Sequence, residues 1–383
     1  MTSPRPLRVV IAPDKFKGSL TAVQAANAIA RGVRRSVPDA DVCVLPVADG
    51  GEGTVDAAVS AGYARHLVTV QGPTGEPVQA AFAVRGDQAV LELAEASGLR
   101  RLHSGRPAPL IASTYGTGQL LLAALDAGAR SVVLGVGGSA STDGGAGMAQ
   151  ALGARLTDTD GHELPPGGAA LRDLARIDLT DLDARLATTS VVLASDVDNP
   201  LIGQHGAAAV YGPQKGASDY DVAGLEAALT HYAWVVHRDL GVDISRVAGG
   251  GAAGGTGAGA LAFLRARITS GIALVLDVVG FAAALTGADL VLTGEGSLDA
   301  QSLSGKTPIG VSEAAAARGI PVIALVGQLA VTTDQLRSVG ITSARALLEL
   351  EPDESCARQH AADLLSALAA QVAAAFSVAG APA

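Results

Sequence analysis

The hydrophobic pattern at the start of the chain predicts two strand–helix units. Residues 8–12 form a short apolar run rich in valine and isoleucine, which is typical of a buried parallel strand. Apolar residues then recur at helical spacing over residues 21–37, just before a proline. A second strand is expected at residues 41–47, and a glycine-rich loop and another helix follow it. This alternation predicts a parallel sheet covered by helices.

The pattern changes after about residue 67. Short apolar segments joined by Gly-Pro and Gly-Asp turns are typical of antiparallel strands, and they occupy residues 68–70, 78–84 and 89–93. Beyond a helix at residues 116–127, buried strands are expected at 131–136 and 190–194. The middle of the chain is therefore predicted to be mixed α/β.

The last hundred residues again show the alternation of strands and helices that is predicted at the start of the chain. Strands are expected at residues 288–292 and 321–326, with a helix over 309–318 between them. The 383 residues also exceed the length at which a single core stops growing. We therefore predict an α/β protein of two domains. One is discontinuous and comprises residues 1–67 and 286–383, and the other is a mixed α/β domain inserted at 68–285.

Composition narrows the choice of partners. Hydrophobic residues make up 49 % and charged residues 17 %, as in globular proteins, whereas aromatic residues make up only 3 %. The net charge of −10 argues against nucleic acid or an anionic membrane as a partner, but it allows an anionic small molecule. The sequence leaves the oligomeric state open.

Three further features favour a soluble protein of the cytoplasm. Cys43 and Cys356 lie far apart and belong to no metal-binding spacing, as expected in a reducing compartment. The most apolar stretch, residues 272–292, is interrupted by Asp277 and Asp289, so we do not expect it to span a membrane. The first residues also lack the apolar run of a signal peptide.

Lysine is rare and its positions are unusual. Only four of the 27 cationic side chains are lysines, and each lies in or beside a glycine-containing segment: Lys15, Lys17, Lys215 and Lys306. A compact ammonium next to flexible backbone is often used to bind phosphate. The alternative is a compositional bias toward arginine that left a few lysines at arbitrary places.

Residues 135–147 combine glycines with hydroxyl side chains, after a predicted strand and before a predicted helix. Their backbone amides and the helix N-terminus could bind an anion. Ser139, Ser141 and Thr142 could donate to phosphate, and Asp143 could hold a metal or accept a proton. The segment also matches the dinucleotide fingerprint loosely, which leaves an NAD-dependent dehydrogenase as an alternative. Glycines present only for tight packing are the other alternative.

Two more glycine-containing segments could contact a ligand. Ser304-Gly305-Lys306-Thr307 resembles the end of a P-loop, but residue 300 is alanine where a P-loop has its first glycine. A P-loop is therefore excluded, although Lys306 could contact phosphate in another geometry. The glycine-rich run 249–259 is either a flexible lid or a second loop of close backbone approach.

Carboxylates recur in the glycine- and proline-containing loops. They are Asp49, Glu52, Asp143, Asp196, Asp198, Glu295 and Asp299. A single loop carboxylate usually caps a helix or makes an Asx-turn. Together with the lysines, however, these groups supply what phosphoryl transfer needs: cations for the phosphates, carboxylates for Mg²⁺ and a base for the hydroxyl proton.

Six motifs, in one order and covering nearly the whole chain, resemble those of the bacterial type I glycerate kinases. They are Pro13-Asp14-x-Phe16-Lys17-Gly18-Ser19, Asp49-Gly50-Gly51-Glu52-Gly53-Thr54, Gly137 to Gly145, Asp196-Val197-x-Asn199-Pro200-Leu201, Gly212-Pro213-Gln214-Lys215-Gly216-Ala217, and Gly294-Glu295-Gly296 with Asp299 and Gly305-Lys306. Departures are small: Lys15 stands where the family usually has serine, Ser195 where cysteine is frequent, and Tyr211 where phenylalanine is usual.

The resemblance implies a flavodoxin-like (Rossmann-like) domain and a domain of restriction-enzyme-like topology. It also implies that ATP and Mg²⁺ are used to phosphorylate D-glycerate, commonly at the 2-hydroxyl, with 3-phosphoglycerate as the alternative product. A non-catalytic sensor of small acids is the alternative outside the enzymes.

On these motifs we expect the following roles. Lys17, with Ser19, binds the glycerate carboxylate or the γ-phosphate, and Asp196 is the base, with Asp143 as the second candidate. Further substrate contacts are expected from Asp49, Glu52 and Asn199, and Mg²⁺ ligands from Glu295 and Asp299. The ATP phosphates are expected to contact Gly137, Gly138, Ser139, Ser141, Thr142, Gly144, Gly145, Lys215 and Lys306.

Overall fold

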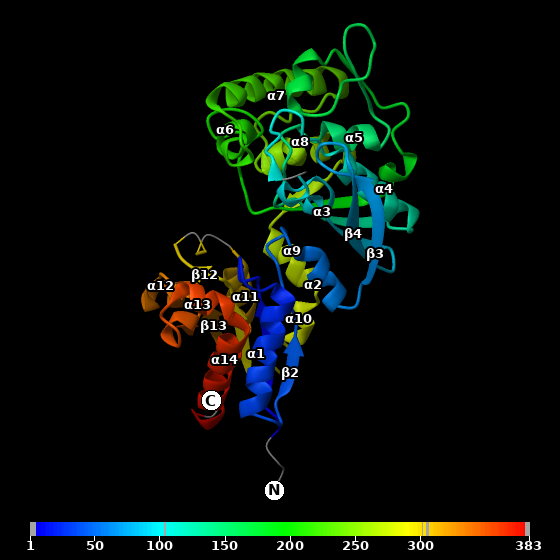
Figure 1. Ribbon diagram of the computed structural model, residues 1–383. Coiled ribbons are helices and arrows are strands. Elements are labelled where there is room, and N and C mark those ends of the chain that lie inside the picture. Colours follow the sequence, from blue (N-terminus) through cyan, green and yellow to red (C-terminus); the bar gives the residue numbers. More distant parts are fainter. Residues whose placement is uncertain (1–4, 103–104, 301, 304–305, 380–383) are drawn as a thin grey trace. The chain divides into compact units, whose positions relative to one another are not determined.

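The computed structural model describes residues 5–102, 105–300, 302–303 and 306–379. The chain divides into two compact units. Unit 1 comprises Met1–Asp49, Asp56–Ala61 and Ile272–Ala383, and unit 2 comprises Gly50–Val55 and Gly62–Gly271. Each unit has its own sheet and its own hydrophobic core, and each is described separately below (Figure 1).

The sheet of unit 1 is parallel and has five strands. In spatial order they are β15 (Ser343–Ala346), β13 (Val322–Val326), β11 (Leu290–Gly294), β1 (Arg8–Pro13) and β2 (Asp41–Val44). Numbered along the chain within this unit, the strand order reads 2-1-3-4-5. The direction of winding therefore reverses between β1 and β11, which makes their junction the topological switch point of the sheet.

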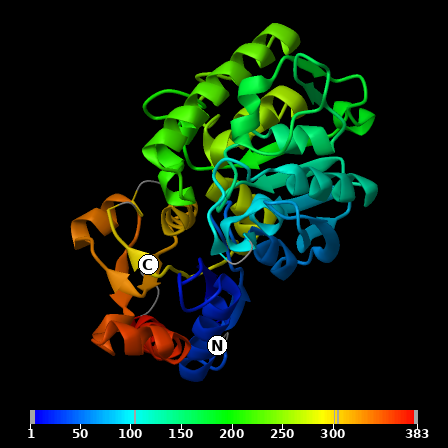
Figure 2. The ribbon, with the colours of Figure 1, turned by 45° about the horizontal axis from the view of Figure 1, so that its top comes forward.

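Helices cover both faces of this sheet. On one face, α1 (Ala22–Ser36) and α14 (Ala361–Ala379) lie side by side in Figure 1 and in Figure 2, and they pack with Val9 and Ile11 of β1. A Cβ added at Gly32 of α1 would lie 2.1 Å from the carbonyl oxygen of Ser366, so glycine is needed for this close approach. Thr21 caps α1 in a capping box with Gln24, which explains why the helix begins there.

The opposite face carries the helices α2 (Thr54–Ser60), α9 (Gly271–Val278), α10 (Phe281–Ala284) and α11 (Thr307–Ala316). Val10 and Val291 point to this side, because successive side chains of a strand alternate between faces. The remaining elements of unit 1 are α12 (Thr333–Ser338), α13 (Glu354–Gln359) and the short pair β12 (Ser297–Leu298) and β14 (Gln328–Leu329).

The units divide at Gly271, whereas the sequence pattern placed the end of the inserted domain at residue 285. Val275 of α9 and Phe281 of α10 are buried in the same cluster as Val10 and Val291 of the unit 1 sheet. These two helices therefore belong to unit 1. Residues 50–55 and 62–67, assigned from the pattern to the terminal domain, lie in unit 2.

Unit 2 is built on a mixed sheet of six strands. In spatial order they are β10 (Arg267–Thr269), β9 (Ser190–Ala194), β6 (Ser131–Gly135), β5 (Gln88–Glu92), β4 (Pro77–Arg85) and β3 (Ala64–Gln71). The strands β3, β4 and β5 pair antiparallel, and β5, β6, β9 and β10 pair parallel. The predicted change from antiparallel strands to buried parallel strands is confirmed.

The helices of unit 2 share one hydrophobic core with this sheet. They are α3 (Leu93–Ser97), α4 (Tyr115–Asp126), α5 (Ala146–Ala151), α6 (Ala207–Tyr211), α7 (Asp219–Leu240) and α8 (Ala252–Leu264). A separate antiparallel pair is formed by β7 (Arg155–Thr157) and β8 (Arg176–Asp178). The long helix α7 begins at the capping box of Ser218 and Asp221 and ends at the left-handed Gly241.

The glycine-rich run 249–259 is a loop of close approach rather than an exposed lid. Most of it is buried, and a left-handed turn at Gly254 and Gly255 interrupts α8. A Cβ added at Gly254 would lie 2.0 Å from the carbonyl oxygen of Ser141, and one at Gly257 would lie 2.3 Å from that of Gly249. Only glycine allows these backbone segments to touch.

Within the described residues, α14 is the single helix that is long and apolar enough to cross a membrane. Its Leu365 and Leu368 are fully buried in the core formed with α1, so packing inside unit 1 accounts for its composition. The apolar stretch 272–292, which we did not expect to span a membrane, forms α9, α10 and part of β11.

Candidate active site

Two carboxylates lie side by side at the switch point of the unit 1 sheet. Asp14 directly follows β1 and Glu295 directly follows β11, and the register of these strands pairs Pro13 with Gly294. The backbone N–H of Asp14 donates to the carbonyl oxygen of Gly294 at 2.8 Å. In open α/β sheets, ligands bind at this place, outside the carboxyl ends of the strands.

Asp14 is 6 % exposed and is held by specific donors. The hydroxyl of Thr307 donates to its Oδ2 at 2.6 Å, and the N–H of Lys15 donates to its Oδ1 at 2.6 Å. The Lys15 Nζ lies 3.7 Å from Asp14 Oδ1 and 4.0 Å from Asp49 Oδ1. Burial raises the pKa of Asp14, the Lys15 ammonium lowers it, and the carboxylate of Asp49 raises it again. No role was expected for Asp14 from the sequence, although its position in the loop after a predicted strand is a usable signal.

Glu295 is 9 % exposed, and its Oε1 is buried with no hydrogen-bond partner among the described residues. Burial raises the pKa of Glu295 to about 7. A side-chain hydrogen bond from Ser302 and the Lys306 ammonium oppose this pKa shift, while the carboxylates of Asp14 and Asp299 add to it. An unpartnered buried oxygen is rare and calls for an explanation, such as a bound ion.

The neighbouring predicted residues occupy the starts of turns and helices. Asp299 Oδ1 accepts from the N–H of Ser302 at 3.0 Å, and Lys306 is the N-cap residue of α11. Ser304 and Gly305 of the same motif lie outside the described residues. The structure thus brings Glu295, Asp299 and Lys306 into one neighbourhood.

Lys17 is exposed at the tip of a tight loop in unit 1. The loop is closed by a hydrogen bond of 2.8 Å from the N–H of Phe16 to the carbonyl oxygen of Leu20, and Gly18 supplies a φ of 81°. The hydroxyl of Ser19 donates to the carbonyl oxygen of Phe16 at 3.1 Å, so it braces the loop. The backbone of Lys17 passes close to Gly296, where an added Cβ would lie 3.1 Å from the Lys17 nitrogen.

In unit 2, Asp143 is 1 % exposed and surrounded by donors. Its Oδ2 accepts from the N–H and the hydroxyl of Thr114, each at 2.8 Å, and from the N–H of Gly147 at 3.3 Å. Its Oδ1 accepts from the N–H of Gly145 at 3.2 Å. Burial raises the pKa of Asp143, and these hydrogen bonds oppose the shift. The carboxylate holds the start of α5 against the start of α4.

Lys215 lies in the same buried region and is 2 % exposed. Its Nζ donates to the Ser139 hydroxyl at 2.9 Å and also to the carbonyl oxygen of Ser141. Burial lowers the pKa of Lys215 to about 7, and the Asp143 carboxylate raises it. The hydroxyl oxygens of Ser141 and Thr142 are buried and make no hydrogen bond with described residues. The structure therefore brings Lys215 into contact with Ser139 and Ser141 and close to Asp143, three residues of the glycine-rich segment 135–147.

Packing accounts for several glycines of this loop. A Cβ added at Gly144 would lie 2.6 Å from the ring of Tyr232, and one at Gly145 would lie 3.2 Å from the Cα of Gly259. A Cβ added at Gly137 would lie 2.7 Å from the Cα of Gly51. Gly138, by contrast, is exposed and has a φ of 74°. The exposed part of the loop is thus limited to its beginning.

Asp196 is exposed just after β9. Its Oδ1 accepts from the hydroxyl of Ser270 at 2.9 Å and from the N–H of Gly271 at 2.7 Å, so the carboxylate has a defined orientation. Asn199, in the same loop, uses its amide internally: Nδ2 donates to the carbonyl oxygen of His205 at 2.9 Å, and Oδ1 accepts from the hydroxyl of Tyr211 at 2.7 Å.

Glu52 belongs to an ion-pair network that the sequence did not reveal. Arg100 pairs with both Glu52 and Glu95, and Arg101 pairs with Glu95 at 2.9 Å. The buried Glu92 accepts from the N–H groups at the start of α2, from Gly53 at 3.1 Å and from Val55 at 2.6 Å. A glutamate inside the apolar run 89–93 was the available signal.

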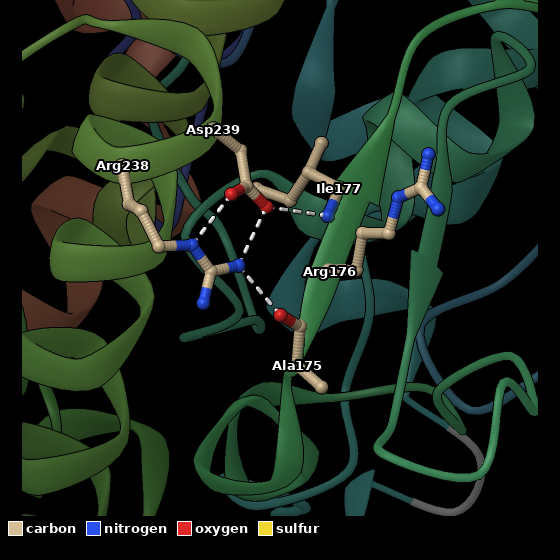
Figure 3. Close-up of a pocket in the computed structure, with 5 residues that line it drawn as sticks. All are labelled: Ala175, Arg176, Ile177, Arg238 and Asp239. Atoms are coloured by element: carbon tan, nitrogen blue, oxygen red, sulfur yellow. Dashed lines mark hydrogen bonds and ion pairs between the residues drawn. The ribbon is translucent and has the colours of Figure 1, made fainter.

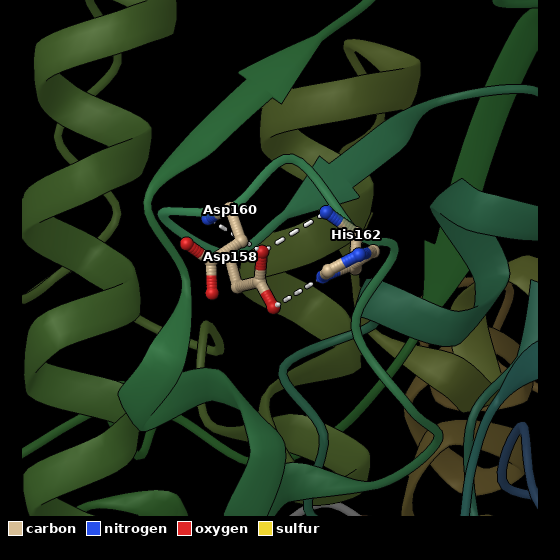
Figure 4. Close-up of side chains that lie close together, drawn as sticks. All are labelled: Asp158, Asp160 and His162. Atoms are coloured by element: carbon tan, nitrogen blue, oxygen red, sulfur yellow. Dashed lines mark hydrogen bonds and ion pairs between the residues drawn. The ribbon is translucent and has the colours of Figure 1, made fainter.

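A surface pocket and an acidic cluster contain none of the site residues that the sequence predicted. A surface pocket lies between β8 and the end of α7 (Figure 3), where Arg238 donates to Asp239 at 2.6 Å and to the carbonyl oxygen of Ala175 at 2.6 Å. The potential ligand atoms of Asp158, Asp160 and His162 lie within 4.8 Å of one another (Figure 4). Asp158 Oδ1 accepts from the N–H of Asp160 and of His162, each at 2.9 Å, so a turn accounts for this cluster.

Comparison with known proteins identifies the class. A model of the glycerate kinase family matches residues 9–377. The glycerate kinase of Halalkalibacterium halodurans is 48 % identical, over 89 % of this chain and 90 % of that protein. The glycerate 2-kinase of Escherichia coli is 45 % identical, over 89 % of this chain and 91 % of that protein. A crystal structure from Salmonella typhimurium LT2, of a protein provisionally named glycerate kinase 2, superposes with a TM-score of 0.86 at 43 % identity and covers 98 % of this chain and 99 % of that one.

These matches span both units. The prediction of a kinase is confirmed, and a mixed α/β fold with parallel strands agrees with the solved structure. The chain belongs to the glycerate kinase family.

Proposed function

We propose that this protein is a glycerate kinase of the bacterial type I class, which transfers the γ-phosphoryl group of ATP to the 2-hydroxyl of D-glycerate. The observation that carries the proposal is the family match over residues 9–377. The position of transfer is supported by the relative from Escherichia coli that is named glycerate 2-kinase and is 45 % identical. We also propose a cytoplasmic location, which the family assignment and the two free cysteines support.

We assign the base to Asp196 rather than to Asp143. Asp196 is exposed and held in one orientation by Ser270 and Gly271, whereas Asp143 is 1 % exposed and surrounded by donors. In the reaction, the Asp196 carboxylate accepts the proton of the glycerate hydroxyl. The hydroxyl oxygen then forms a bond to the γ-phosphorus, and the bond between that phosphorus and the bridging oxygen of ADP breaks.

Mg²⁺ is proposed at Glu295 and Asp299. The residues fit such an ion, because the buried Oε1 of Glu295 lacks a hydrogen-bond partner among described residues and Mg²⁺ prefers oxygen ligands. When bound, Mg²⁺ would neutralise the negative charge of the phosphates. Lys17 and Lys306 would contribute positive charge in unit 1, and Asp49 and Ser19 would contact or orient the glycerate.

In unit 2 we propose that the ATP phosphates meet the exposed beginning of the glycine loop, at Gly137 and Gly138. The buried residues behind it, Ser141, Thr142, Gly144, Gly145 and Lys215, would hold the loop in shape and would act through Ser139. Glu52 and Asn199 are proposed near the substrate. We also propose that unit 1 is flavodoxin-like, because its strand order is 2-1-3-4-5, and that unit 2 has restriction-enzyme-like topology.

A coupled assay of ADP release with D-glycerate, followed by ³¹P NMR of the product, tests the proposal. We expect release of ADP and formation of 2-phosphoglycerate. Formation of 3-phosphoglycerate would contradict the assigned hydroxyl, and binding of glycerate without ADP release would favour a non-catalytic sensor.

A further inference from the structure

The carboxylate pair at the switch point of unit 1 includes a residue without an assigned role. Asp14 and Glu295 each stand one residue beyond the paired positions Pro13 and Gly294 of neighbouring parallel strands. Two strand ends therefore place the two side chains at one edge of the sheet by register alone. Asp14 is 6 % exposed and Glu295 is 9 % exposed, so two carboxylates are removed from water at adjacent places.

The hydrogen bonds at this edge leave one oxygen unsatisfied. Asp14 is oriented by Thr307 at 2.6 Å and by the N–H of Lys15 at 2.6 Å, and the Lys15 Nζ lies 3.7 Å from its Oδ1. Glu295 Oε1 is buried and has no hydrogen-bond partner among the described residues. Ser302 and Lys306 partner the Glu295 side chain only in part. A buried carboxylate oxygen without a hydrogen bond is costly, so a cation that contacts both carboxylates would satisfy Oε1.

The donor atoms indicate the class of cation. The carboxylates of Asp14, Glu295 and Asp299 and the hydroxyl of Thr307 offer oxygen only, which suits Mg²⁺ or Mn²⁺ better than zinc. The α11 helix begins at Thr307, and its hydroxyl fixes Asp14 in place. This arrangement is formed within unit 1, from its own strand ends.

We propose that Asp14 and Glu295 together form a divalent-cation site that binds Mg²⁺ or Mn²⁺ in the absence of nucleotide. The biological use of this site rests on the proposed kinase function, whereas the binding itself does not. Asp14 is thus the residue that completes the site expected at Glu295 and Asp299.

The test is titration of the full chain with Mn²⁺, without ATP or glycerate, followed by electron paramagnetic resonance of the free ion. We expect binding by the wild type and a Kd raised about tenfold or more in Asp14→Asn and in Glu295→Gln, since loss of outer-sphere partners alone weakens metal sites by about 10- to 100-fold. Asp158→Asn is the matched control, because it removes a carboxylate from the other acidic cluster, and its Kd should equal that of the wild type.

Thermal unfolding provides a second measurement that also reports whether each variant folds. The Tm of the wild type should rise with added Mg²⁺, because a ligand that binds only the native state stabilises it. Asp14→Asn should fold but lose this rise, and Asp14→Glu should keep part of it. A wild-type Kd that Asp14→Asn leaves unchanged would overturn the proposal, and so would Mn²⁺ binding that Asp158→Asn abolishes.

Failure of the two proposals can be told apart. A protein that phosphorylates D-glycerate but binds no Mn²⁺ without nucleotide refutes the site and leaves the kinase function standing. A protein that binds Mn²⁺ through Asp14 but releases no ADP refutes the kinase function and leaves the site standing.

Discussion

The two units bury charge in different ways. In unit 2, the Asp143 carboxylate is surrounded by donors from Thr114, Gly145 and Gly147, and the nearby Lys215 donates to Ser139 and Ser141. In unit 1, Asp14 and Glu295 lie side by side and an oxygen of Glu295 lacks a hydrogen-bond partner among described residues. The difference concerns these carboxylates: the donors around Asp143 indicate a carboxylate that maintains structure, whereas the buried Oε1 of Glu295 remains available to a ligand.

The largest expected effect separates the two candidate bases. Asp196→Asn should lower kcat by about 10²- to 10⁴-fold, the usual contribution of a general base, with little change in ATP affinity. Asp143→Asn should mainly lower the stability of unit 2, because the amide cannot accept from all of the donors around Asp143. Steady-state kinetics and denaturant unfolding of both variants measure the difference. Near-normal turnover by Asp196→Asn would remove Asp196 from the mechanism.

Two glycine substitutions test how much the close backbone contact beside Asp143 and Lys215 contributes to stability. Gly254→Ala should destabilise the protein by several kcal/mol, because its Cβ would lie 2.0 Å from the Ser141 carbonyl oxygen and φ is 67°. Gly241→Ala is the matched control: φ is 72°, but no atom lies within 4 Å of the added Cβ, so only about 1 kcal/mol of backbone strain is expected. Equal losses in urea denaturation would show that contact with the Ser141 loop adds nothing.

The buried lysine should give a distinctive pH dependence. Its pKa falls from 10.5 to about 7 on folding, so above pH 7 the unfolded state binds more protons than the folded state. The penalty for burying Lys215 is therefore complete below pH 7 and is lost as the pH rises toward 10.5. Between pH 7 and 9, the free energy of unfolding of the wild type should rise by about 2 kcal/mol relative to Lys215→Met.

Lys17→Met is the control for that measurement, because Lys17 is exposed. Its free energy of unfolding should follow the wild-type pH profile. If Lys215→Met also followed it, Lys215 would be charged in the folded protein at neutral pH, and the contrast between the two units would weaken.

The smallest effect is expected at the surface ion pair of unit 2. Glu52→Gln should change the free energy of unfolding by less than about 1 kcal/mol, since exposed ion pairs contribute little. The proposed substrate contact predicts instead a raised KM for D-glycerate. Asp56→Asn, a nearby change in the first turn of α2, serves as the comparison. An unchanged KM in Glu52→Gln would exclude Glu52 from substrate binding.

Much of the fold could be predicted because its signals are local. The apolar runs that became β1, β6, β9 and β11 stand next to turn residues, and helical spacing marked α1. Periodicity therefore located the loops after the strands, where Asp196 and Glu295 lie. The boundary at Gly271 could not be predicted, because the apolar pattern of α9 and α10 does not specify which of the two sheets buries them.

By itself, the sequence determined the family and the loops in which its charged residues lie, because motifs and strand–loop alternation are properties of neighbouring residues. Only the tertiary structure decided which of those charges meet. It paired Asp14 with Glu295 through the order of two strands 281 positions apart in sequence, as the bond from Thr293 to Ala12 shows. It also enclosed Lys215 and Asp143 beneath glycines 254 and 255. The burial of a charged group and its hydrogen-bond partners depend on segments that meet only after folding. Both change the pKa and the reactivity of a carboxylate or an ammonium.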